Sequence, residues 1–206
     1  MMKSSTSVGC VDVSRETLEK LEHLCVLVTK WTKAINLIAP KSVYDIWNRH
    51  IVDSAQIFHC SPNEWTRWID LGSGGGLPAL VVAIIDKQKR SVTLIESDKR
   101  KCLFLKTAQR ELDLNISIIN SRITDVKIAK SDILSARALA PLTDLFSYAD
   151  QFLHKDGTAI FPKGARYQEE LDQAIKNWHF DVKTHISQTN PDARVLEISR
   201  INRRES

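Results

Sequence analysis

The sequence predicts an α/β fold with a mostly parallel sheet, an antiparallel last strand and a helical N-terminal extension. From Trp68 onward, short apolar segments alternate with amphipathic ones, which is typical of a parallel sheet covered by helices on both faces. Before that point only helical periodicity occurs. The last two expected strands, 179–186 and 194–201, are joined by a short turn. They must be antiparallel, because a parallel crossover needs about a dozen residues.

We expect the helical extension to span residues 1–64 and the α/β domain to span residues 65–206. Ser14 can cap the first helix, with Glu16 in the first turn. A second helix is expected after Ser42, and residues 61–64 resemble a turn. The apolar face of the first helix comprises Leu18, Leu21, Cys25, Val28 and Trp31.

The α/β domain is expected to contain five strands before the final antiparallel pair. Its helices should cover Leu77–Asp86, a segment capped by Ser97, a segment from Pro141, and residues 169–177. The five strands are expected at residues 68–71, 91–95, 116–119, 132–136 and 158–161.

Composition places the chain among ordinary globular proteins, with 43% hydrophobic and 26% charged residues. There is no apolar run near the 18 or so residues of a membrane span, and residues 1–10 do not resemble a secretory signal. We therefore expect a cytoplasmic protein, and a monomer. The four cysteines have irregular spacings, which argues against a metal site or a disulfide framework. A net charge of +4 permits a polyanionic partner without requiring one.

The strongest local signal is a glycine-rich loop at the end of the first strand of the sheet. In the segment from Asp70 to Pro78, four glycines occur within five positions, and Ser73 lies among them. The spacing fits neither the dinucleotide pattern G-x-G-x-x-G nor a phosphate-binding loop that ends in Gly-Lys-Ser/Thr. An acidic residue beside Gly72 and Gly74 suits S-adenosylmethionine, which carries a cationic sulfonium and an ammonium but no phosphate.

Glu96 lies at the end of the second strand, about 20 residues after the loop. A carboxylate there can accept hydrogen bonds from both ribose hydroxyls. The alternative is a flexible turn with an exposed acid. Because the loop and the acid occur at matching strand ends, where open α/β sheets bind ligands, we favour a nucleoside cofactor.

Several stretches together carry a resemblance to a known family. The chain resembles the bacterial small-subunit ribosomal RNA guanine-N7 methyltransferases, the RsmG or GidB (glucose-inhibited division protein B) family, from about Trp31 to Ile201. The paired segments R-H-x-x-D-S and G-S-G-x-G-L-P are specific to the family in this order and distance. The matching stretches are Asn36-Leu37, Arg49 to Ser54, Asp70 to Pro78, Leu94 to Ser97, Lys99 to Lys101, Ser121-Arg122, Ser135 to Ala138 and Pro162 to Gly164.

The resemblance implies a class I, Rossmann-like methyltransferase fold. It also implies S-adenosylmethionine as cofactor, and a guanine in the decoding-region loop of 16S ribosomal RNA, in the small ribosomal subunit, as substrate. The cofactor contacts implied by the family are Gly72, Leu77, Ile123, Thr124 and Arg137. In departure from the family, Ala79 replaces a glycine and Val82 replaces a proline, and the pair Ile123-Thr124 lacks the usual acid.

Methyl transfer to guanine N7 needs no general base, because N7 presents a lone pair and loses no proton. Catalysis then rests on alignment and electrostatics. The sequence agrees, because the fourth strand ends in Ala136-Arg137-Ala138 and not in the Asn/Asp-Pro-Pro-aromatic motif of amino-methyltransferases. No Pro-Cys, the motif of cytosine-C5 enzymes, occurs either.

Five residues are candidates for RNA contacts: Arg49, His50, Lys163, Arg203 and Arg204. His50 is either functional or a buried histidine bonded to Asp53 or to backbone. Lys163 meets either an RNA phosphate or only solvent. The arginine tail is either a phosphate-binding arm or a disordered end. Arg137 has a surface salt bridge as its alternative interpretation.

Three other functions remain open from the residues alone. A methyltransferase acting on another RNA or on a small molecule would share every cofactor feature. A nicotinamide-dependent oxidoreductase is disfavoured by the glycine spacing. A non-catalytic RNA-binding protein is disfavoured by the intact loop and Glu96.

Overall fold

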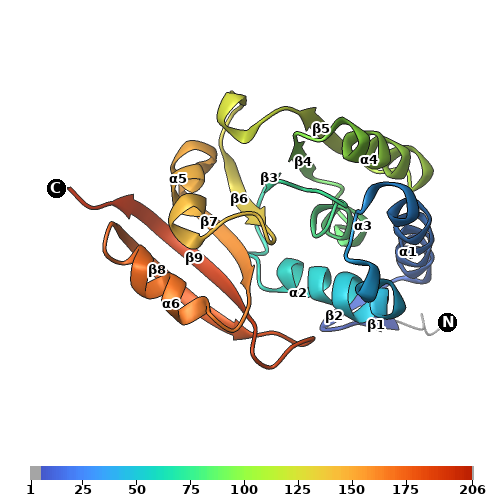
Figure 1. Ribbon diagram of the computed structural model, residues 1–206, viewed down its shortest axis with the longest axis horizontal. Helices are drawn as coiled ribbons and strands as arrows, with labels where there is room; N and C mark the ends of the chain where they lie inside the picture. The colour runs from blue at the N-terminus through green and yellow to red at the C-terminus, as the bar shows by residue number, and fades with distance from the viewer. Residues whose placement is uncertain (1–5, 206) are drawn as a thin grey trace.

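A seven-stranded sheet organises the protein in the computed structural model, which describes residues 6–205 (Figure 1). The strand order is β5-β4-β3-β6-β7-β9-β8. The strands are β3 (Arg67–Leu71), β4 (Ser91–Glu96), β5 (Ile116–Asn120), β6 (Ser131–Ala136), β7 (Leu153–Lys163), β8 (Trp178–Ile186) and β9 (Arg194–Arg203).

The pairing confirms a mostly parallel sheet with an antiparallel last strand. The five strands from β3 to β7 pair in parallel, and β9 lies antiparallel between β7 and β8. Lys163 at the end of β7 pairs with Arg194 at the start of β9, whereas Thr158 pairs with Ser199. Strand β9 therefore starts at the carboxyl edge of the parallel strands and ends at the opposite edge.

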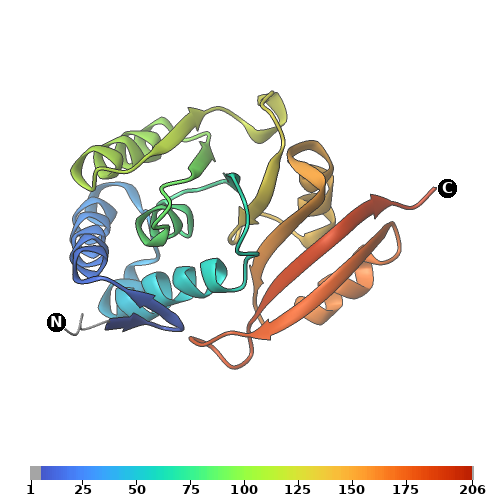
Figure 2. The ribbon, with the colours of Figure 1, turned by 180° about the vertical axis from the view of Figure 1, so that it is seen from behind.

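Helices cover both faces of the sheet, as expected. Helices α1 (Arg15–Ile35), α3 (Ala79–Ile85) and α4 (Lys99–Glu111) gather at one end of the molecule, whereas α5 (Leu142–Phe152) and α6 (Tyr167–Ala174) lie at the other (Figures 1 and 2). Neighbouring residues of each strand point to opposite faces and enter different clusters. Trp68, Val92 and Ile133 pack in the cluster of α1, α3 and α4, and Ile69, Ile95 and Leu134 in that of α5 and α6.

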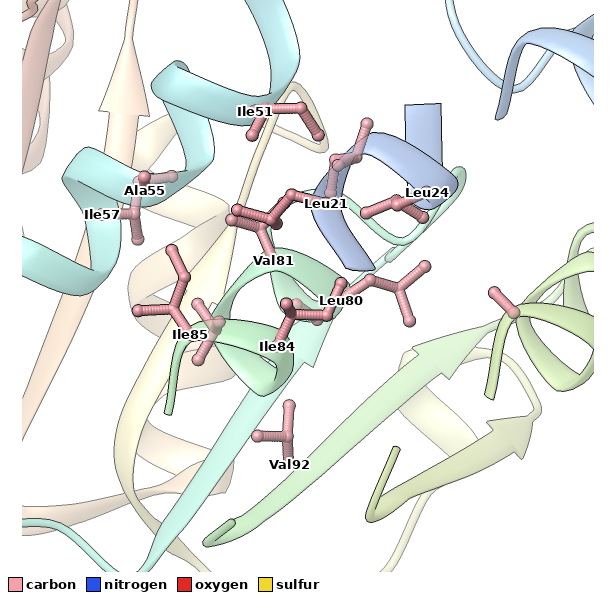
Figure 3. Close-up of a cluster of buried hydrophobic side chains, with 14 of the residues drawn as sticks. Leu21, Leu24, Ile51, Ala55, Ile57, Leu80, Val81, Ile84, Ile85 and Val92 are labelled. Atoms are coloured by element: carbon pink, nitrogen blue, oxygen red, sulfur yellow. The ribbon is translucent and has the colours of Figure 1, made fainter. Parts of the chain in front are cut away.

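The N-terminal segment covers helix α3. Ser14 caps α1 as expected, since its hydroxyl accepts a hydrogen bond from the Thr17 N–H at 3.1 Å. In Figure 3 the buried side chains of this segment, such as Leu21 and Ile51, meet those of α3, such as Val81. One hydrophobic cluster therefore joins the extension to the sheet and fixes the extension beside the strand ends.

Two expectations for this segment were wrong. The single helix after Ser42 is instead a 3₁₀ turn η1 (Pro40–Asp45), a π-helical turn η2 (Trp47–Val52) and a short α2 (Asp53–His59). The segment also contains a hairpin, β1 (Thr6–Val8) and β2 (Val11–Val13), which was not predicted because three-residue strands are too short to show a period.

Further corrections concern element ends. The cap of α4 is Asp98 and not Ser97, because the Asp98 carboxylate accepts the N–H groups of Arg100 and Lys101. Helix α3 begins two residues later than expected, and β7 begins at Leu153, five residues earlier. Within residues 6–205, no helix is long and apolar enough to cross a membrane.

Candidate functional site

Two adjoining hollows lie at the carboxyl edge of the parallel strands. The smaller, of about 420 Å³, is lined by residues that follow β3, β4 and β5. The larger, of about 1060 Å³, is lined by residues that follow β6 and β7, by the turn before β9 and by the N-terminal segment. Ala138 and Leu139 line both hollows. We call the smaller one the cleft, the larger one the cavity, and residues 138–142 the wall between them.

The glycine loop and Glu96 meet in the cleft, as the matched strand ends predict. Gly72 and Gly74 line it with backbone φ angles of 60° and 55°, a left-handed conformation that other residues rarely adopt. The Gly74 N–H donates to Glu96 Oε2 at 2.8 Å, and the Asp98 N–H donates to Oε1 at 2.7 Å. These two bonds fix the carboxylate at the cleft and leave further lone pairs for a ligand.

Asp70 is buried at the end of β3, where one of its oxygens lacks a partner. Its Oδ1 accepts a 2.6 Å hydrogen bond from the Ser135 hydroxyl, which in turn accepts from Trp68 Nε1 at 2.7 Å. Its Oδ2 has no hydrogen-bond partner within the described residues. Burial raises the pKa of Asp70 to about 6, although the Ser135 bond and the Arg137 charge oppose the shift. A buried acceptor of this kind suits a cationic ligand nearby.

The other expected cofactor contacts fall into two groups. Ile123 and Thr124, in the turn η3 (Ile123–Asp125), line the cleft. Ser73 and Leu77 are buried behind it. The Ser73 N–H donates to the Ile95 carbonyl at 3.1 Å, which holds the glycine loop against β4. The two residues that depart from the family pattern, Ala79 and Val82, lie in helix α3 and are fully buried.

Arg137 lines the cavity and is held by the R-H-x-x-D-S segment. Its guanidinium donates to Asp53 Oδ2 at 3.1 Å and to His50 Nδ1 at 3.0 Å. Asp53 Oδ1 accepts from Gln56 and from Thr189, in the turn before β9. The salt bridge of the alternative interpretation is thus present, but its side chains are only about one-fifth exposed, and it belongs to a network that joins three separate parts of the chain.

His50 is a buried neutral histidine. Because Arg137 donates to Nδ1, the proton resides on Nε2, which donates to the Ser42 hydroxyl at 2.8 Å. The Ser42 hydroxyl in turn donates to the Ala39 carbonyl. Burial, followed by the charges of Arg137 and Arg49, lowers the pKa of His50 to about 4. The partner of His50 is therefore Arg137 and not Asp53.

The basic residues around the cavity differ in what they contact. Lys163 lines it, yet its amine donates to Glu170 at 2.7 Å and to the Ala140 carbonyl at 2.9 Å. Arg49 and Arg166 also line it and are exposed. Among residues 6–205, neither of these two guanidinium groups is paired with a carboxylate.

Arg203 and Arg204 lie at the opposite edge of the sheet from the two hollows. Arg203 ends β9 and lies over the Trp178 ring, 5.3 Å from its centre. Arg204 is held through its backbone N–H, which donates to the Asn177 carbonyl at 2.9 Å. Both residues therefore belong to an ordered part of the described chain.

Several site residues were missed from the sequence. Ser42, Arg166 and Glu170 carry no motif, and each becomes notable only through a partner on another element or through the cavity that it lines. Glu170, for example, follows Lys163 by seven residues on another element, and no periodicity signals that pairing.

Comparison with known proteins identifies relatives along most of the chain. The sequence profile of the GidB family, described as rRNA small subunit methyltransferase G, matches residues 17–196. A protein of Ruegeria sp. (strain TM1040), named ribosomal RNA small subunit methyltransferase G, is 45% identical over 94% of this chain and 95% of its own. A protein of the same name from Rhizobium meliloti (strain 1021) is 43% identical over 93% of both chains.

Solved structures share the fold at low identity. The ribosomal protein L11 methylase of Lactobacillus delbrueckii subsp. bulgaricus superposes with a TM-score of 0.58 at 20% identity, over 75% of this chain and 79% of its own. A putative S-adenosyl-L-methionine-dependent methyltransferase of Methanococcus maripaludis gives 0.58 at 14% identity, over 99% of both chains. The fold is therefore that of the class I methyltransferases.

Proposed function

The chain belongs to the rRNA small subunit methyltransferase G family, and from this premise we propose that it transfers a methyl group from S-adenosylmethionine to N7 of a guanine in 16S ribosomal RNA. The observation that carries the proposal is the pair of hollows on either side of the wall. The cleft has the features of a nucleoside site, and the cavity beside it is large enough for a purine base. A methyl donor and its acceptor would thus meet across Ala138 and Leu139.

The residues of the cleft fit S-adenosylmethionine, which supplies an activated methyl group on a cationic sulfur. Gly72 and Gly74 allow backbone to lie close to it. Glu96 can accept from the ribose hydroxyls with its remaining lone pairs. Asp70 does not line the cleft, but its buried carboxylate at the end of β3 would add negative charge near the cationic end. Ile123 and Thr124 would contact the cofactor from η3, and Arg137 from the cavity side.

The reaction we propose needs no protein base. The N7 lone pair forms a bond to the methyl carbon while the carbon–sulfur electron pair stays on sulfur, so a neutral thioether and a cationic N7-methylguanine result. His50 could not act as a base here, because Nδ1 accepts from Arg137 and Nε2 already carries the proton. The chain would act through alignment and electrostatics.

We propose that the RNA meets the cavity edge of the molecule. Arg49 and Arg166 are the exposed cations that line the cavity, and phosphate groups are the natural partners of such guanidinium groups. His50 and Lys163 would support this surface from behind and would not contact RNA directly, because each is bonded to another part of the chain.

The test is a methylation assay with labelled S-adenosylmethionine and either free 16S ribosomal RNA or the small subunit. The product is then treated with a reductant and aniline, which cleave RNA at N7-methylguanine. We expect incorporation and a single cleavage site. At saturating cofactor, the single-turnover rate should be flat between about pH 6.5 and 8.5, because no base has to lose a proton.

Two results would contradict the proposal. Methyl incorporation without cleavage would mean that another atom accepts the methyl group. A rate that rises about tenfold per pH unit would require a general base. Methylation of small molecules but of no RNA would instead favour a small-molecule methyltransferase.

A further inference from the structure

The wall between the two hollows is tied to the rest of the protein by one partly buried ion pair. Lys163, the last residue of β7, donates both to Glu170 of α6 and to the Ala140 carbonyl in the middle of the wall. Glu170 Oε2 also accepts the Leu142 N–H at 2.9 Å, at the end of the wall. Two side chains thus hold two backbone groups of the same five-residue segment.

The lysine is the better shielded member of the pair. The Lys163 side chain is 9% exposed and that of Glu170 is 29% exposed. The lysine amine is satisfied by the carboxylate and the carbonyl, and removing the carboxylate would leave a largely buried charge without its counter-ion. The pair therefore has more influence on local structure than an ion pair on the surface.

The wall needs such a restraint because its own backbone is strained. Ala138 has a φ angle of 52°, a conformation that costs an alanine free energy and persists only where surrounding contacts impose it. Leu139 packs so closely on Gly72 that a Cβ on the glycine would lie 2.6 Å from Leu139 Cδ1. A shift of the wall would therefore change the shape of the cleft as well as that of the cavity.

We infer that Lys163 and Glu170 form a positioning pair, which sets the wall and thereby aligns the methyl donor with the acceptor. The alignment claim rests on the proposed function, whereas the restraint on the wall does not. Alignment is sensitive to displacements near 1 Å, so a loosened wall should slow transfer more than it weakens RNA binding.

The test compares two variants of the pair with a control. Lys163→Met removes the amine and keeps the length of the side chain. Glu170→Gln retains an oxygen that can accept both hydrogen bonds and should therefore have the smaller effect. Lys183→Met breaks another Lys–Glu pair, the one with Glu197, on the exposed part of β8 and β9, and serves as the control.

Two readouts need only the protein and S-adenosylmethionine. In Lys163→Met, exchange of the Leu142 amide hydrogen, which Glu170 accepts, should be about tenfold faster, while β3 and β4 stay unchanged. Cofactor affinity measured by calorimetry should fall several-fold, because Leu139 and Ala138 line the cleft. With RNA present, kcat should fall about tenfold while KM for RNA stays within about twofold.

Unchanged exchange of the Leu142 amide hydrogen, or equal effects in Lys183→Met, would overturn the inference. A rise in KM alone, with a shallower salt dependence, would also overturn it and would assign Lys163 to an RNA phosphate. If the unmodified protein methylates no RNA, the proposed function fails. Faster exchange and weaker cofactor binding in Lys163→Met would still support the restraint on the wall.

Discussion

At the scale of single residues, burial shifts the pKa values of two ionisable groups of the site in opposite directions. Burial and neighbouring cations keep His50 neutral, which lets its Nδ1 accept from Arg137 and so orient that guanidinium. Burial also raises the pKa of Asp70, and the Arg137 charge offsets only part of that shift. Because Asp70 Oδ2 has no hydrogen-bond partner within the described residues, the ionised carboxylate is costly to folding, and the cationic end of the proposed cofactor would offset that cost.

Asp70→Asn should therefore stabilise the protein and weaken cofactor binding. The folded pKa of about 6 exceeds the usual value near 4, so ionisation disfavours the folded state above that range. At about pH 8 the variant should gain about 1–3 kcal/mol in unfolding free energy, measured with urea. The gain should vanish as the pH falls from about 6 to about 4, where the native carboxyl is protonated too.

The same variant should bind S-adenosylmethionine about tenfold more weakly at neutral pH, or about 1.4 kcal/mol, because the amide carries no charge. In the unmodified protein, affinity should decline below about pH 6 as Asp70 gains its proton, and this decline should be absent in Asp70→Asn. Equal affinities for the two proteins at neutral pH would remove Asp70 from the cofactor site.

At the scale of elements, helix starts decide where cleft residues lie. Helix α4 begins with three basic residues, Lys99 to Lys101, which is unfavourable at the positive end of a helix. The Asp98 carboxylate offsets this by accepting two backbone N–H groups, and those bonds hold the pKa of Asp98 below its usual range. The helix therefore starts one residue later than the sequence predicts, and Ser97 is left to line the cleft.

Asp98→Ala should lower the midpoint of thermal unfolding by a few degrees, because the first turn of α4 loses its cap. Asp98→Asn, which can still cap, should lose less. Ser97→Ala is the matched control and should leave the midpoint unchanged. Circular dichroism on heating measures all three. If Ser97→Ala lowers the midpoint more than Asp98→Ala does, Ser97 is the cap of α4, as the sequence suggests.

At the scale of the whole molecule, the sequence predicted those features that depend on residues close together along the chain. The alternation of strands and helices, the turn before β9 and the glycine loop with Glu96 are all of this kind. The side-chain bonds that complete the site cannot be predicted in this way, because they join different elements: Arg137 to His50 and Lys163 to Glu170. The proposed division of the chain at residue 64 stays a prediction, since one buried cluster spans it.

The sheet gives the molecule two edges, and each edge carries a pair of arginines. Arg49 and Arg166 lie at the carboxyl edge with the two hollows, whereas Arg203 and Arg204 lie at the opposite edge. The sequence suggested the second pair as a phosphate-binding arm. If a guanine must enter the cavity, however, the RNA backbone beside it is within reach of the first pair only.

The double variant Arg49→Ala with Arg166→Ala should therefore raise the Kd for 16S ribosomal RNA about tenfold or more at moderate salt. Removing one arginine–phosphate interaction should reduce the slope of log K against log salt by about 1, so the double variant should reduce it by about two. Arg203→Ala with Arg204→Ala removes the same charge and should change neither quantity. Filter binding across a salt series measures both, and thermal unfolding shows that each variant is folded. If the second pair proves dominant, the RNA crosses both edges of the sheet, and the tail is the arm that the sequence suggested.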